Sequence, residues 1–420
     1  MNFIIIFRAK SMTDTSLLPH VLNAYVQAEE PISNAQLYQR VATSAQLPLA
    51  LFEETAPVGR SQAPVSLLKR RIRWHQQTLR GANVLTRIDG ERGVWGLATP
   101  AAEGLNQIDE TTAVLGFSTR LGLAVICSCK HFFSDWREPI SLILTSPPYP
   151  IAQPRAYGNP SQAEYVDWVC NILEPVIKVM ADGASLALNV SNDIFIPGTP
   201  ARSTYLERLV IALEDRFGLE LIDRLVWANP QKPPGPIAWA SKQRVQLNTG
   251  YEPVLWMTNN ARKLKSNNQR VLMPHTPQHL KLMARGGEQR TANNSDGAYR
   301  IRPGSYGRVT DGRIPRNVLN FPHVSAQDRA YRAQCERRGI RPHGATMSYG
   351  LTRFLVEFLS ERGDLVADPM GGSLKTALAC EELDRRWVTT EKMIEYVQGG
   401  SYSFENAPDF YRPPVWAGRA

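Results

Sequence analysis

The sequence predicts an α/β fold built on a parallel sheet, preceded by a smaller unit of helices and a hairpin. Two observations carry this prediction. From residue 113 to about residue 400, short apolar strands alternate with amphipathic helices, which is typical of parallel sheets. Before them, residues 16–98 contain three helical patterns and then two alternating segments that flank the turn Asp89–Arg92.

The composition is that of an ordinary globular protein. The chain has 420 residues, of which 43% are hydrophobic and 21% are charged, and this length suggests two or three domains. No apolar run approaches the roughly 18 residues that a membrane helix needs, and the apolar start at residues 2–7 is too short for a secretory signal. A true start at Met12 is an open alternative. We expect a cytoplasmic protein without membrane contact.

The five cysteines are scattered and show no CxxC spacing. This pattern argues against a disulfide framework and against a zinc site, and it fits a reducing compartment. We see no cluster of metal ligands in the sequence and expect no metal. The pair Cys127 and Cys129 lies in an apolar stretch and is expected to be structural.

The net charge of +9 comes from one segment. Residues 261–342 hold 17 lysines and arginines against 5 aspartates and glutamates, so the rest of the chain is slightly acidic. A local basic excess is the usual footprint of a polyanion partner. The segment is also poor in apolar periodicity, so we expect loops that lie on that partner. The alternative is a solvated basic surface.

Residues 12–100 are predicted to form a separate unit. Its third helix, 66–80, is strongly basic, and no acidic residue occurs between Ala56 and Ile88. Three helices followed by a two-stranded hairpin resemble a winged helix-turn-helix, which places its third helix in the major groove of DNA. A protein-interaction module or a plain packing domain is the alternative. The candidate DNA contacts on this helix are Lys69, Arg70 and Arg73.

A Pro-rich loop of four residues, Ser146, Pro147, Pro148 and Tyr149, directly follows an apolar strand. Ligands of open parallel sheets bind beyond the carboxyl ends of the strands. The two prolines fix the path of the loop, so the Ser146 side chain and the Pro147 carbonyl can accept both hydrogens of one exocyclic amine. Tyr149 can stack on a flat ring, which suits chemistry on a flipped nucleobase. The alternative is a Pro-rich turn with a core tyrosine.

A second loop suits a nucleoside cofactor. A short strand ends in an acid and a glycine turn, and a helix follows it. Glu391 ends the next strand about twenty residues later, where a carboxylate can hold a ribose diol. The residues of the turn are Asp368, Pro369, Met370, Gly371, Gly372 and Ser373.

Together, the two loops resemble those of amino-directed DNA methyltransferases. The order of the Ser-Pro-Pro-Tyr loop, a recognition region and then the cofactor loop is similar to the permuted β class of that family. The resemblance covers roughly residues 114–400. The segments 251–256, 343–360 and 391–396 also resemble motifs of the family. A serine in the first position of the Pro-Pro-Tyr motif is typical of enzymes that methylate N4 of cytosine.

The resemblance implies a Rossmann-like, circularly permuted methyltransferase fold and S-adenosylmethionine as the cofactor. It implies that Ser128 and Tyr349 also contact the cofactor. The sequence departs from the family pattern at Met370, at Leu374 in place of a glycine and at Lys375 in place of a threonine. The glycine-to-leucine change could crowd the approach of the backbone to the cofactor.

Double-stranded DNA is the implied substrate, and a cognate restriction endonuclease is a partner that the resemblance allows. The predicted parts after residue 100 are 113–260 and 343–400 as the two halves of the catalytic domain, 261–342 as the target-recognition region and 401–420 as a tail. Further candidate DNA contacts are Lys232, Arg244, Arg300, Arg302, Arg308, Arg313 and Arg316. Most of these arginines are expected to contact phosphates and a few to read bases.

Three other functions stay open from the sequence. Methylation of N6 of adenine needs the same amine chemistry, and Ser146 alone does not decide between the bases. A catalytically silent DNA-binding protein could keep the fold, which the altered cofactor loop favours. An RNA methyltransferase is the third, although a winged helix that binds duplex DNA argues against it. The sequence does not indicate the recognition site or the oligomeric state.

Overall fold

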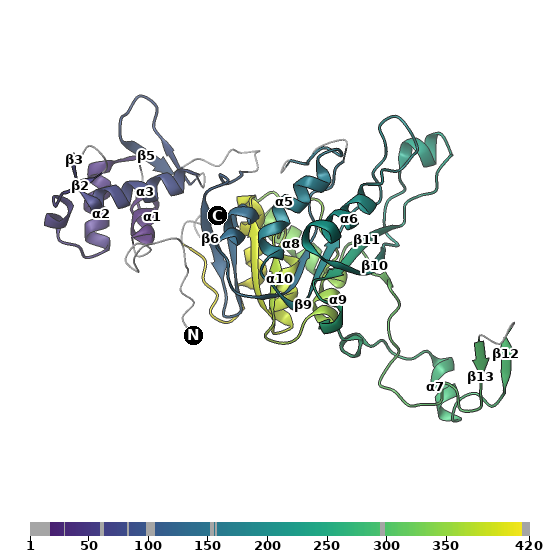
Figure 1. Cartoon of the computed structure of the whole chain (residues 1–420). Coiled ribbons are helices and arrows are strands. Elements are labelled where there is room, and N and C mark those ends of the chain that lie inside the picture. Colours follow the sequence, from purple (N-terminus) through teal and green to yellow (C-terminus); the bar gives the residue numbers. More distant parts are fainter. Residues whose placement is uncertain are drawn as a thin grey trace.

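The computed structural model describes residues 17–28, 30–58, 63–81, 84–97, 106–151, 155, 158–294 and 299–413. The apolar start, the alternative start at Met12 and residues 98–105, at the start of the linker between the N-terminal unit and residue 113, lie outside these residues. A large α/β domain carries a smaller N-terminal unit on one side and a thin arm on the other (Figure 1). Within the described ranges, no helix has the length and apolar character needed to cross a bilayer.

A nine-stranded sheet forms the centre of the large domain, in the order β14-β10-β11-β9-β8-β15-β16-β7-β6. The five neighbours β9, β8, β15, β16 and β7 are parallel, whereas β6 and β11 run antiparallel to the strands beside them. The expected parallel sheet is confirmed at its centre, and its flanks are mixed. The strands are β6 (Ala113–Ser118), β7 (Gly122–Cys127), β8 (Ile140–Thr145), β9 (Met180–Asn189), β10 (Glu220–Ala228), β11 (Tyr251–Thr258), β14 (Val318–Asn320), β15 (Leu365–Asp368) and β16 (Arg386–Glu391).

Helices cover both faces of this sheet, and the central strands are therefore mostly apolar on both faces. In β8, Leu142 and Leu144 belong to the core on one face and Ile143 to the core on the other. All three side chains are fully buried. The first face is covered by α9 (Tyr349–Leu359), α10 (Lys375–Glu382) and α11 (Ile394–Ser401), and the second by α4 (Cys129–Ser134), α5 (Tyr165–Ile177) and α6 (Tyr205–Phe217).

The N-terminal unit contains the three helices and the hairpin that the sequence predicts. Its strands form a small sheet in the order β1-β5-β4. A capping box starts the second helix, because the Ser33 side chain accepts from the Gln36 backbone and the Gln36 side chain accepts from the Ser33 N–H. The elements are α1 (Leu18–Val26), β1 (Ile32–Ser33), α2 (Asn34–Ser44), η1 (Leu49–Phe52), β2 (Ala56–Val58), β3 (Ala63–Val65), α3 (Leu67–Gly81), β4 (Leu85–Arg87) and β5 (Val94–Leu97).

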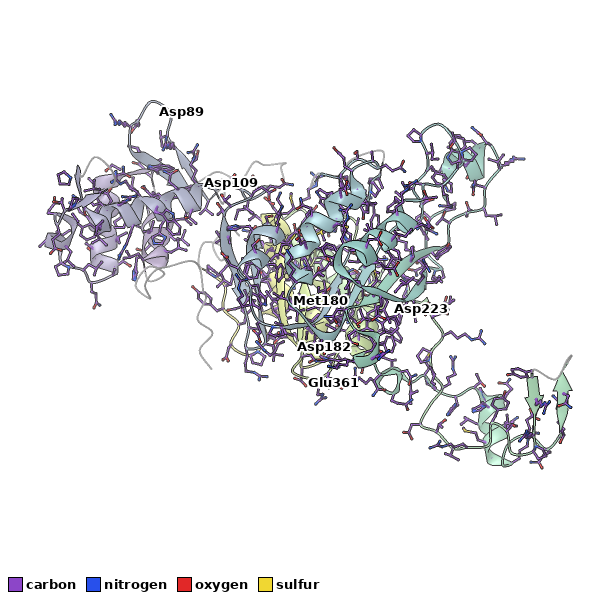
Figure 2. The ribbon with its side chains drawn as sticks, viewed as in Figure 1. Asp89, Asp109, Met180, Asp182, Asp223 and Glu361 are labelled. Atoms are coloured by element: carbon purple, nitrogen blue, oxygen red, sulfur yellow. The ribbon has the colours of Figure 1, made fainter. Side chains whose placement is uncertain are left out.

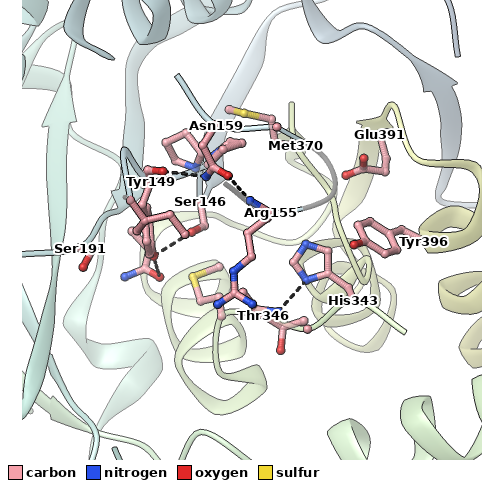
Figure 3. Close-up of a pocket in the computed structure, with 18 of the residues that line it drawn as sticks. Ser146, Tyr149, Arg155, Asn159, Ser191, His343, Thr346, Met370, Glu391 and Tyr396 are labelled. Carbon is pink, nitrogen blue, oxygen red and sulfur yellow. Dashed lines mark hydrogen bonds between the residues drawn. The ribbon is translucent and has the colours of Figure 1, made fainter. Parts of the chain in front are cut away.

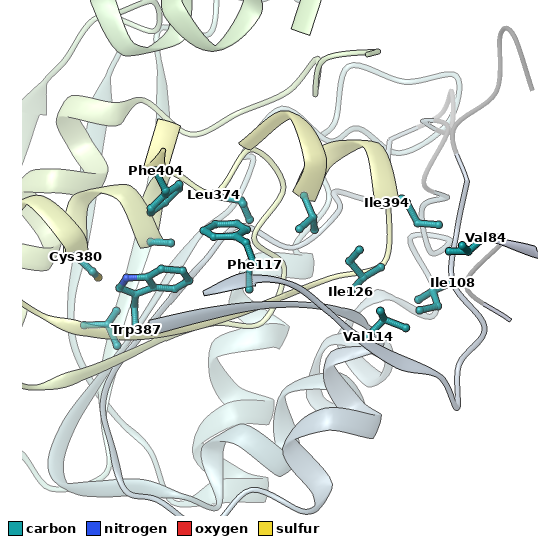
Figure 4. Close-up of a cluster of buried hydrophobic side chains, with 14 of the residues drawn as sticks. Val84, Ile108, Val114, Phe117, Ile126, Leu374, Cys380, Trp387, Ile394 and Phe404 are labelled. Carbon is teal, nitrogen blue, oxygen red and sulfur yellow. The ribbon is translucent and has the colours of Figure 1, made fainter. Parts of the chain in front are cut away.

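The N-terminal unit is joined to the large domain by a continuous apolar core. Val84 and Ile108 from the junction lie in the same buried cluster as Val114 and Ile394 (Figure 4). The described part of the linker is also fixed by polar contacts. The Asn106 backbone and side-chain N–H groups donate to the two carboxylate oxygens of Glu395 on α11, at 2.9 and 2.6 Å.

The first part of the predicted recognition region lies at the amino edge of the sheet. Met180, Asp182 and Glu361 mark this edge (Figure 2). Arg270 donates to the carbonyl of Ser360 and pairs with Glu361, while Lys263 pairs with Asp182. These contacts hold the segment 261–271 against the sheet, where part of its basic charge is neutralised by carboxylates.

The arm begins and ends at one backbone bridge. Met273 and Arg313 exchange two backbone hydrogen bonds of 3.0 and 2.9 Å, which close the neck of the excursion between them. The sequence predicted loops for the basic segment 261–342. This segment also forms helices, and the side chains of Thr276 and Ser325 cap two of them. The elements after β10 outside the sheet are η2 (Ile237–Lys242), η3 (Ala261–Lys263), η4 (Asn268–Val271), α7 (Pro277–Ala284), β12 (Ala292–Asn294), β13 (Tyr299–Ile301), α8 (Ala326–Arg337) and η5 (Tyr402–Phe404).

The described part of the predicted tail packs on the large domain. Phe404 lies in the buried cluster beside Phe117, with ring centroids 4.8 Å apart. Tyr411 exchanges two backbone hydrogen bonds of 2.9 Å with Ser118 at the end of β6. The chain therefore covers the β6 side of the sheet after its last helix.

We expect Gly122→Ala to destabilise the protein by about 1–3 kcal/mol, the usual cost of overpacking. A Cβ at Gly122 would lie 2.1 Å from the backbone oxygen of Trp387 on the paired strand β16. Chemical denaturation measures this free energy of unfolding. Gly250→Ala is the matched control, because its Cβ would meet no atom within 4 Å. Equal losses in the two variants would contradict the prediction.

Candidate active site

Side chains from five strands meet at the carboxyl edge of the sheet, around a cavity of about 1000 Å³. Ser146 follows β8, Asn189 ends β9, Glu391 ends β16 and Ser128 follows β7. Glu252 joins them from β11, because this strand is antiparallel to β9 and begins where β9 ends. Figure 3 shows Ser146 and Tyr149 on one side of the cavity and Glu391 and Tyr396 on the other.

The Ser-Pro-Pro-Tyr loop lines the first side of the cavity with all four of its residues. The hydroxyl groups of Ser146 and Tyr149 are 3.1 Å apart and hydrogen-bonded. The Tyr149 hydroxyl also lies 3.2 Å from Asn189 Oδ1 and 3.2 Å from Glu252 Oε2. Burial, with Glu252 as the next cause, raises the pKa of Tyr149 well above its usual value, so the phenol stays protonated.

Asn159 fixes the conformation of this loop. Its side-chain amide donates to the Tyr149 carbonyl at 2.7 Å, and its side-chain oxygen accepts from the Arg155 backbone at 2.6 Å. The sequence analysis did not identify Asn159, which lies in a polar stretch without a motif. Asn159 follows Tyr149 by ten residues, and the two come into contact only because the chain between them turns back on itself.

Glu391, Ser128, Pro369 and Met370 line the second side of the cavity. The two oxygens of Glu391 accept the backbone N–H groups of Gly372 and Met393, at 2.8 and 2.9 Å. Burial raises the pKa of this carboxyl. These two donors orient the carboxylate, and each oxygen keeps a second lone pair for another donor.

The glycine turn is shaped by close contacts. A Cβ at Gly371 would lie 2.2 Å from the Thr389 hydroxyl oxygen. A Cβ at Gly372, which has a φ of +50°, would lie 3.3 Å from His343 Nε2. Both positions thus favour glycine, and the turn passes close under the cavity.

Two of the three departures from the family pattern, Leu374 and Lys375, lie in the core. Leu374 is fully buried and adopts a φ of +63°, a left-handed conformation that is rare for a bulky residue. Lys375 is also buried, and its ammonium pairs with Asp328 on α8. The same group donates to Thr346 Oγ1 and to the Met347 carbonyl, both at 2.7 Å.

Several predicted cofactor residues do not line the cavity. Asp368 is buried just before the lining residues Pro369 and Met370, and its Oδ1 accepts the Met370 N–H at 3.2 Å. Tyr349 is buried at the start of α9, beside Glu382 and away from the cavity wall. Three other residues of the glycine turn also do not line the cavity: Gly371, Gly372 and Ser373.

His343, Thr346 and Tyr396 complete the wall beside Glu391 (Figure 3). The His343 and Tyr396 rings meet edge to face with centroids 4.4 Å apart. Burial, reinforced by the charge of Lys375, lowers the pKa of His343 to about 4, so the imidazole is neutral near pH 7. The sequence analysis covered these positions only as parts of longer motif segments.

The predicted DNA-binding residues fall into three groups. Lys232 lines the cavity and pairs with Glu252 at 3.3 Å, while Arg244 lies in the exposed loop between β10 and β11 with a φ of +59°. On α3, Arg70 and Arg73 are exposed, and Lys69 pairs with Glu53 at 2.9 Å. Arg300, Arg302 and Arg308 lie exposed on the arm, Arg313 closes its neck and Arg316 precedes β14.

Residues 140–402 match the model of a family described as DNA methylases, N6_N4_Mtase. The chain belongs to this family. The family match includes the Ser-Pro-Pro-Tyr loop, Glu391 and Tyr396, so it contributes residues to both sides of the site, whereas Ser128 lies before it. The predicted family is therefore confirmed, whereas the permuted order and the base that is methylated stay predictions.

Individual relatives support the same family. The chain is 32% identical over 267 residues to the type II methyltransferase M.PvuII of Proteus hauseri, covering 64% of this chain and 78% of that protein. It is 21% identical over 265 residues to the DNA adenine methyltransferase YhdJ of Escherichia coli (strain K12), covering 63% and 75%. The solved structure of PvuII DNA methyltransferase (cytosine-N4-specific) matches with a TM-score of 0.54 and 29% identity, covering 68% of this chain and 87% of that one.

We expect Asp368→Asn to stabilise this methylase at alkaline pH. Burial raises the pKa of Asp368 from its ordinary 3.8 to about 6. A raised pKa means that the carboxyl contributes its full stability below pH 4 and loses it as the pH rises through 6. The ionised group therefore costs the folded state about 3 kcal/mol at pH 8, which the variant avoids.

Urea unfolding at pH 4.5 and pH 8 tests this expectation. The gain in the free energy of unfolding should be large at pH 8 and small at pH 4.5. Asp311→Asn, which changes an exposed carboxyl, serves as the control. A gain of equal size at both pH values would refute the assignment of the buried charge to Asp368.

Proposed function

We propose that the protein transfers a methyl group from S-adenosylmethionine to the N4 amine of a flipped cytosine in DNA. One observation carries the proposal. The Ser-Pro-Pro-Tyr loop, which suits an exocyclic amine, and Glu391, which suits a ribose, line the same cavity. A methyl donor bound at one side would therefore face an amine held at the other.

The residues on the second side fit the cofactor. The oriented carboxylate of Glu391 would accept hydrogen bonds from ribose hydroxyls, and Met370, Pro369 and Ser128 would border the adenine. The tight turn at Gly371 and Gly372 keeps side chains out of the approach. When bound, S-adenosylmethionine supplies an electrophilic methyl group. The neutral His343 next to Glu391 adds no positive charge beside it.

The residues on the first side fit the target amine. Ser146 Oγ and the Pro147 carbonyl would accept the two amine hydrogens, which aims the nitrogen lone pair away from the loop. This orientation and the favourable field for a developing positive charge are the two forms of catalysis that the protein supplies. Tyr149 would stack on the base, an interaction worth about 1–3 kcal/mol in single-strand binders.

The choice of cytosine rests on two supports. The first is the Ser-Pro-Pro-Tyr form of the loop, and the second is the cytosine-N4-specific PvuII enzyme among the similar structures. Adenine N6 methylation is the second candidate, since YhdJ is an adenine methyltransferase and is similar over most of its length. We further propose that the motifs follow the permuted order, because β15 precedes the cofactor loop late in the chain yet lies beside β8 in the sheet.

We propose that the N-terminal unit is a winged-helix module that holds the duplex. The exposed face of α3 carries Arg70, Arg73 and Arg80 around Trp74, whose side chain is 61% exposed. A cationic helix with an exposed aromatic ring is suited to phosphates and groove edges. The exposed arginines of the arm would add contacts outside the target site.

Nucleoside analysis tests the proposed reaction. DNA from cells that express the protein should contain N4-methylcytosine, measured by mass spectrometry, and a Ser146→Ala/Tyr149→Ala double variant should abolish it. The loss follows because the variant lacks both the amine acceptor and the stacking ring. N6-methyladenine in place of N4-methylcytosine would overturn the base assignment. The absence of both products would overturn methylation itself.

Charge reversal on α3 tests the proposed duplex contact. Arg70→Glu/Arg73→Glu should weaken binding to duplex DNA and lower the slope of log affinity against log salt by about 0.9 for each phosphate that the helix no longer neutralises. Fluorescence anisotropy across a salt series measures both quantities. Arg208→Glu/Arg224→Glu is the matched control, because both side chains are exposed and lie in the large domain, on α6 and β10. An equal effect of the two variants would argue against a specific role of α3.

A further inference from the structure

A chain of hydrogen bonds leads from the Ser-Pro-Pro-Tyr loop to a carboxylate on β11. Ser146 Oγ lies 3.1 Å from the Tyr149 hydroxyl, and that hydroxyl lies 3.2 Å from Glu252 Oε2. All three residues line the cavity. The first two come from the loop after β8, and the third is brought there by the antiparallel pairing of β11 with β9.

The proposed reaction produces a proton that this site must remove. An amine nitrogen that gains a methyl group carries a positive charge until it loses one of its hydrogens. Ser146, the side chain that would accept that hydrogen, is a neutral alcohol and cannot retain a second proton near neutral pH. A serine in this position therefore needs a base elsewhere.

We propose that Glu252 is the terminal acceptor of the proton released from the target amine, reached through the hydroxyl groups of Ser146 and Tyr149. This inference rests on the proposed amine methylation, whichever of the two bases is the target. It assigns Glu252 a role that the loop motif alone does not contain.

The proton balance is simple. The amine nitrogen forms its bond to the methyl carbon as the bond from that carbon to sulfur breaks, and the electron pair stays on sulfur. An amine proton passes to Ser146 Oγ, the Ser146 proton to the Tyr149 oxygen, and the Tyr149 proton to Glu252. The net change in the protein is one carboxylate converted to a carboxylic acid, which then loses its proton to water.

The surroundings of Glu252 favour this direction. Lys232 pairs with Glu252 Oε1 at 3.3 Å, so this ion pair leaves the other carboxylate oxygen, Oε2, for the Tyr149 hydroxyl. The other partner of the Tyr149 hydroxyl, Asn189 Oδ1, is an amide oxygen that can accept a hydrogen bond but cannot retain a proton. The pKa of Tyr149 lies well above its usual value, so the phenol passes a proton on without remaining ionised.

A second carboxylate of the cavity wall is already committed. Asp193 accepts from the Thr249 hydroxyl at 3.0 Å and pairs with Arg202 at 3.4 Å. The Tyr149 hydroxyl has three hydrogen-bond partners among the described residues, Ser146, Asn189 and Glu252, and of these Glu252 is the carboxylate. Glu252 is therefore the base to which this chain of hydroxyl groups leads.

Two conservative variants test the relay. Glu252→Gln keeps the hydrogen bond to Tyr149 but cannot accept a proton, and Tyr149→Phe keeps the stacking ring but breaks the chain. Each should slow methyl transfer in a single turnover on unmethylated plasmid DNA, on the order of 10²-fold, the lower range for general acid–base catalysis. The double variant should be no slower than the slower single variant, because both interrupt one path.

Readouts other than activity separate proton transfer from a structural role. Binding of S-adenosylmethionine by calorimetry, DNA binding by anisotropy and the thermal midpoint should stay near those of the wild type. Added formate should accelerate Glu252→Ala, in which a small carboxylate can occupy the vacated space, but not Glu252→Gln. Tyr411→Phe and Glu220→Gln are the matched controls, because both side chains are exposed and outside the relay.

The outcomes distinguish the relay from the proposed function. An active wild type with an unchanged rate in Glu252→Gln, or a Glu252→Ala variant that formate does not rescue, overturns the relay alone. A wild type that forms no methylated amine in DNA overturns the proposed function and the relay with it. Slow variants that are rescued by formate and bind both ligands normally support the assignment of Glu252.

Discussion

The parallel pairing of β8 with β15 is the interaction on which the candidate site depends. Val366 pairs with Leu142 and Ala367 with Ile143, although most of the large domain separates the two strands in the sequence. Their carboxyl ends therefore lie side by side, and the loops that follow them face one cavity. Since both strands are buried on both faces, a shift in their register would move closely packed side chains out of their places in the two cores, and packing therefore fixes the relative position of the two loops.

The altered glycine turn is stabilised by an ion pair that the family pattern does not contain. The Lys375 and Asp328 side chains are 8% and 4% exposed, and the ammonium has two further acceptors. Burial acts to raise the pKa of Asp328, but Lys375 and the donors of Ser325 hold it below its usual value. A buried charge of this kind is tolerated because it is paired and hydrogen-bonded. The pair also ties α8 to the helix that follows the turn, so the departure at Lys375 has a structural reason.

The sequence was sufficient where one short segment contained the whole signal. The apolar strands, the Ser-Pro-Pro-Tyr loop and the acid at Glu391 are local patterns, and each lies where strand alternation predicts. The roles of Asn159 and Lys375 could not be predicted, because each depends on a contact made when distant segments fold together. Tyr349 shows the converse limit: its motif suggested a cofactor contact, yet the start of α9 turns its ring into the core. Likewise, net charge located the basic segment but could not show that the carboxylates of Asp182 and Glu361 pair with part of it.

The neck of the arm affects how the sequence of such a protein can evolve. The chain leaves and re-enters the large domain at the bridge between Met273 and Arg313, and the arm crosses none of the strands of the sheet. Insertions, deletions or exchange of the arm would leave the strand pairings and both sides of the cavity in place. Such an excursion can vary independently of its host fold, and a lineage can acquire new specificity through it while the chemistry stays constant.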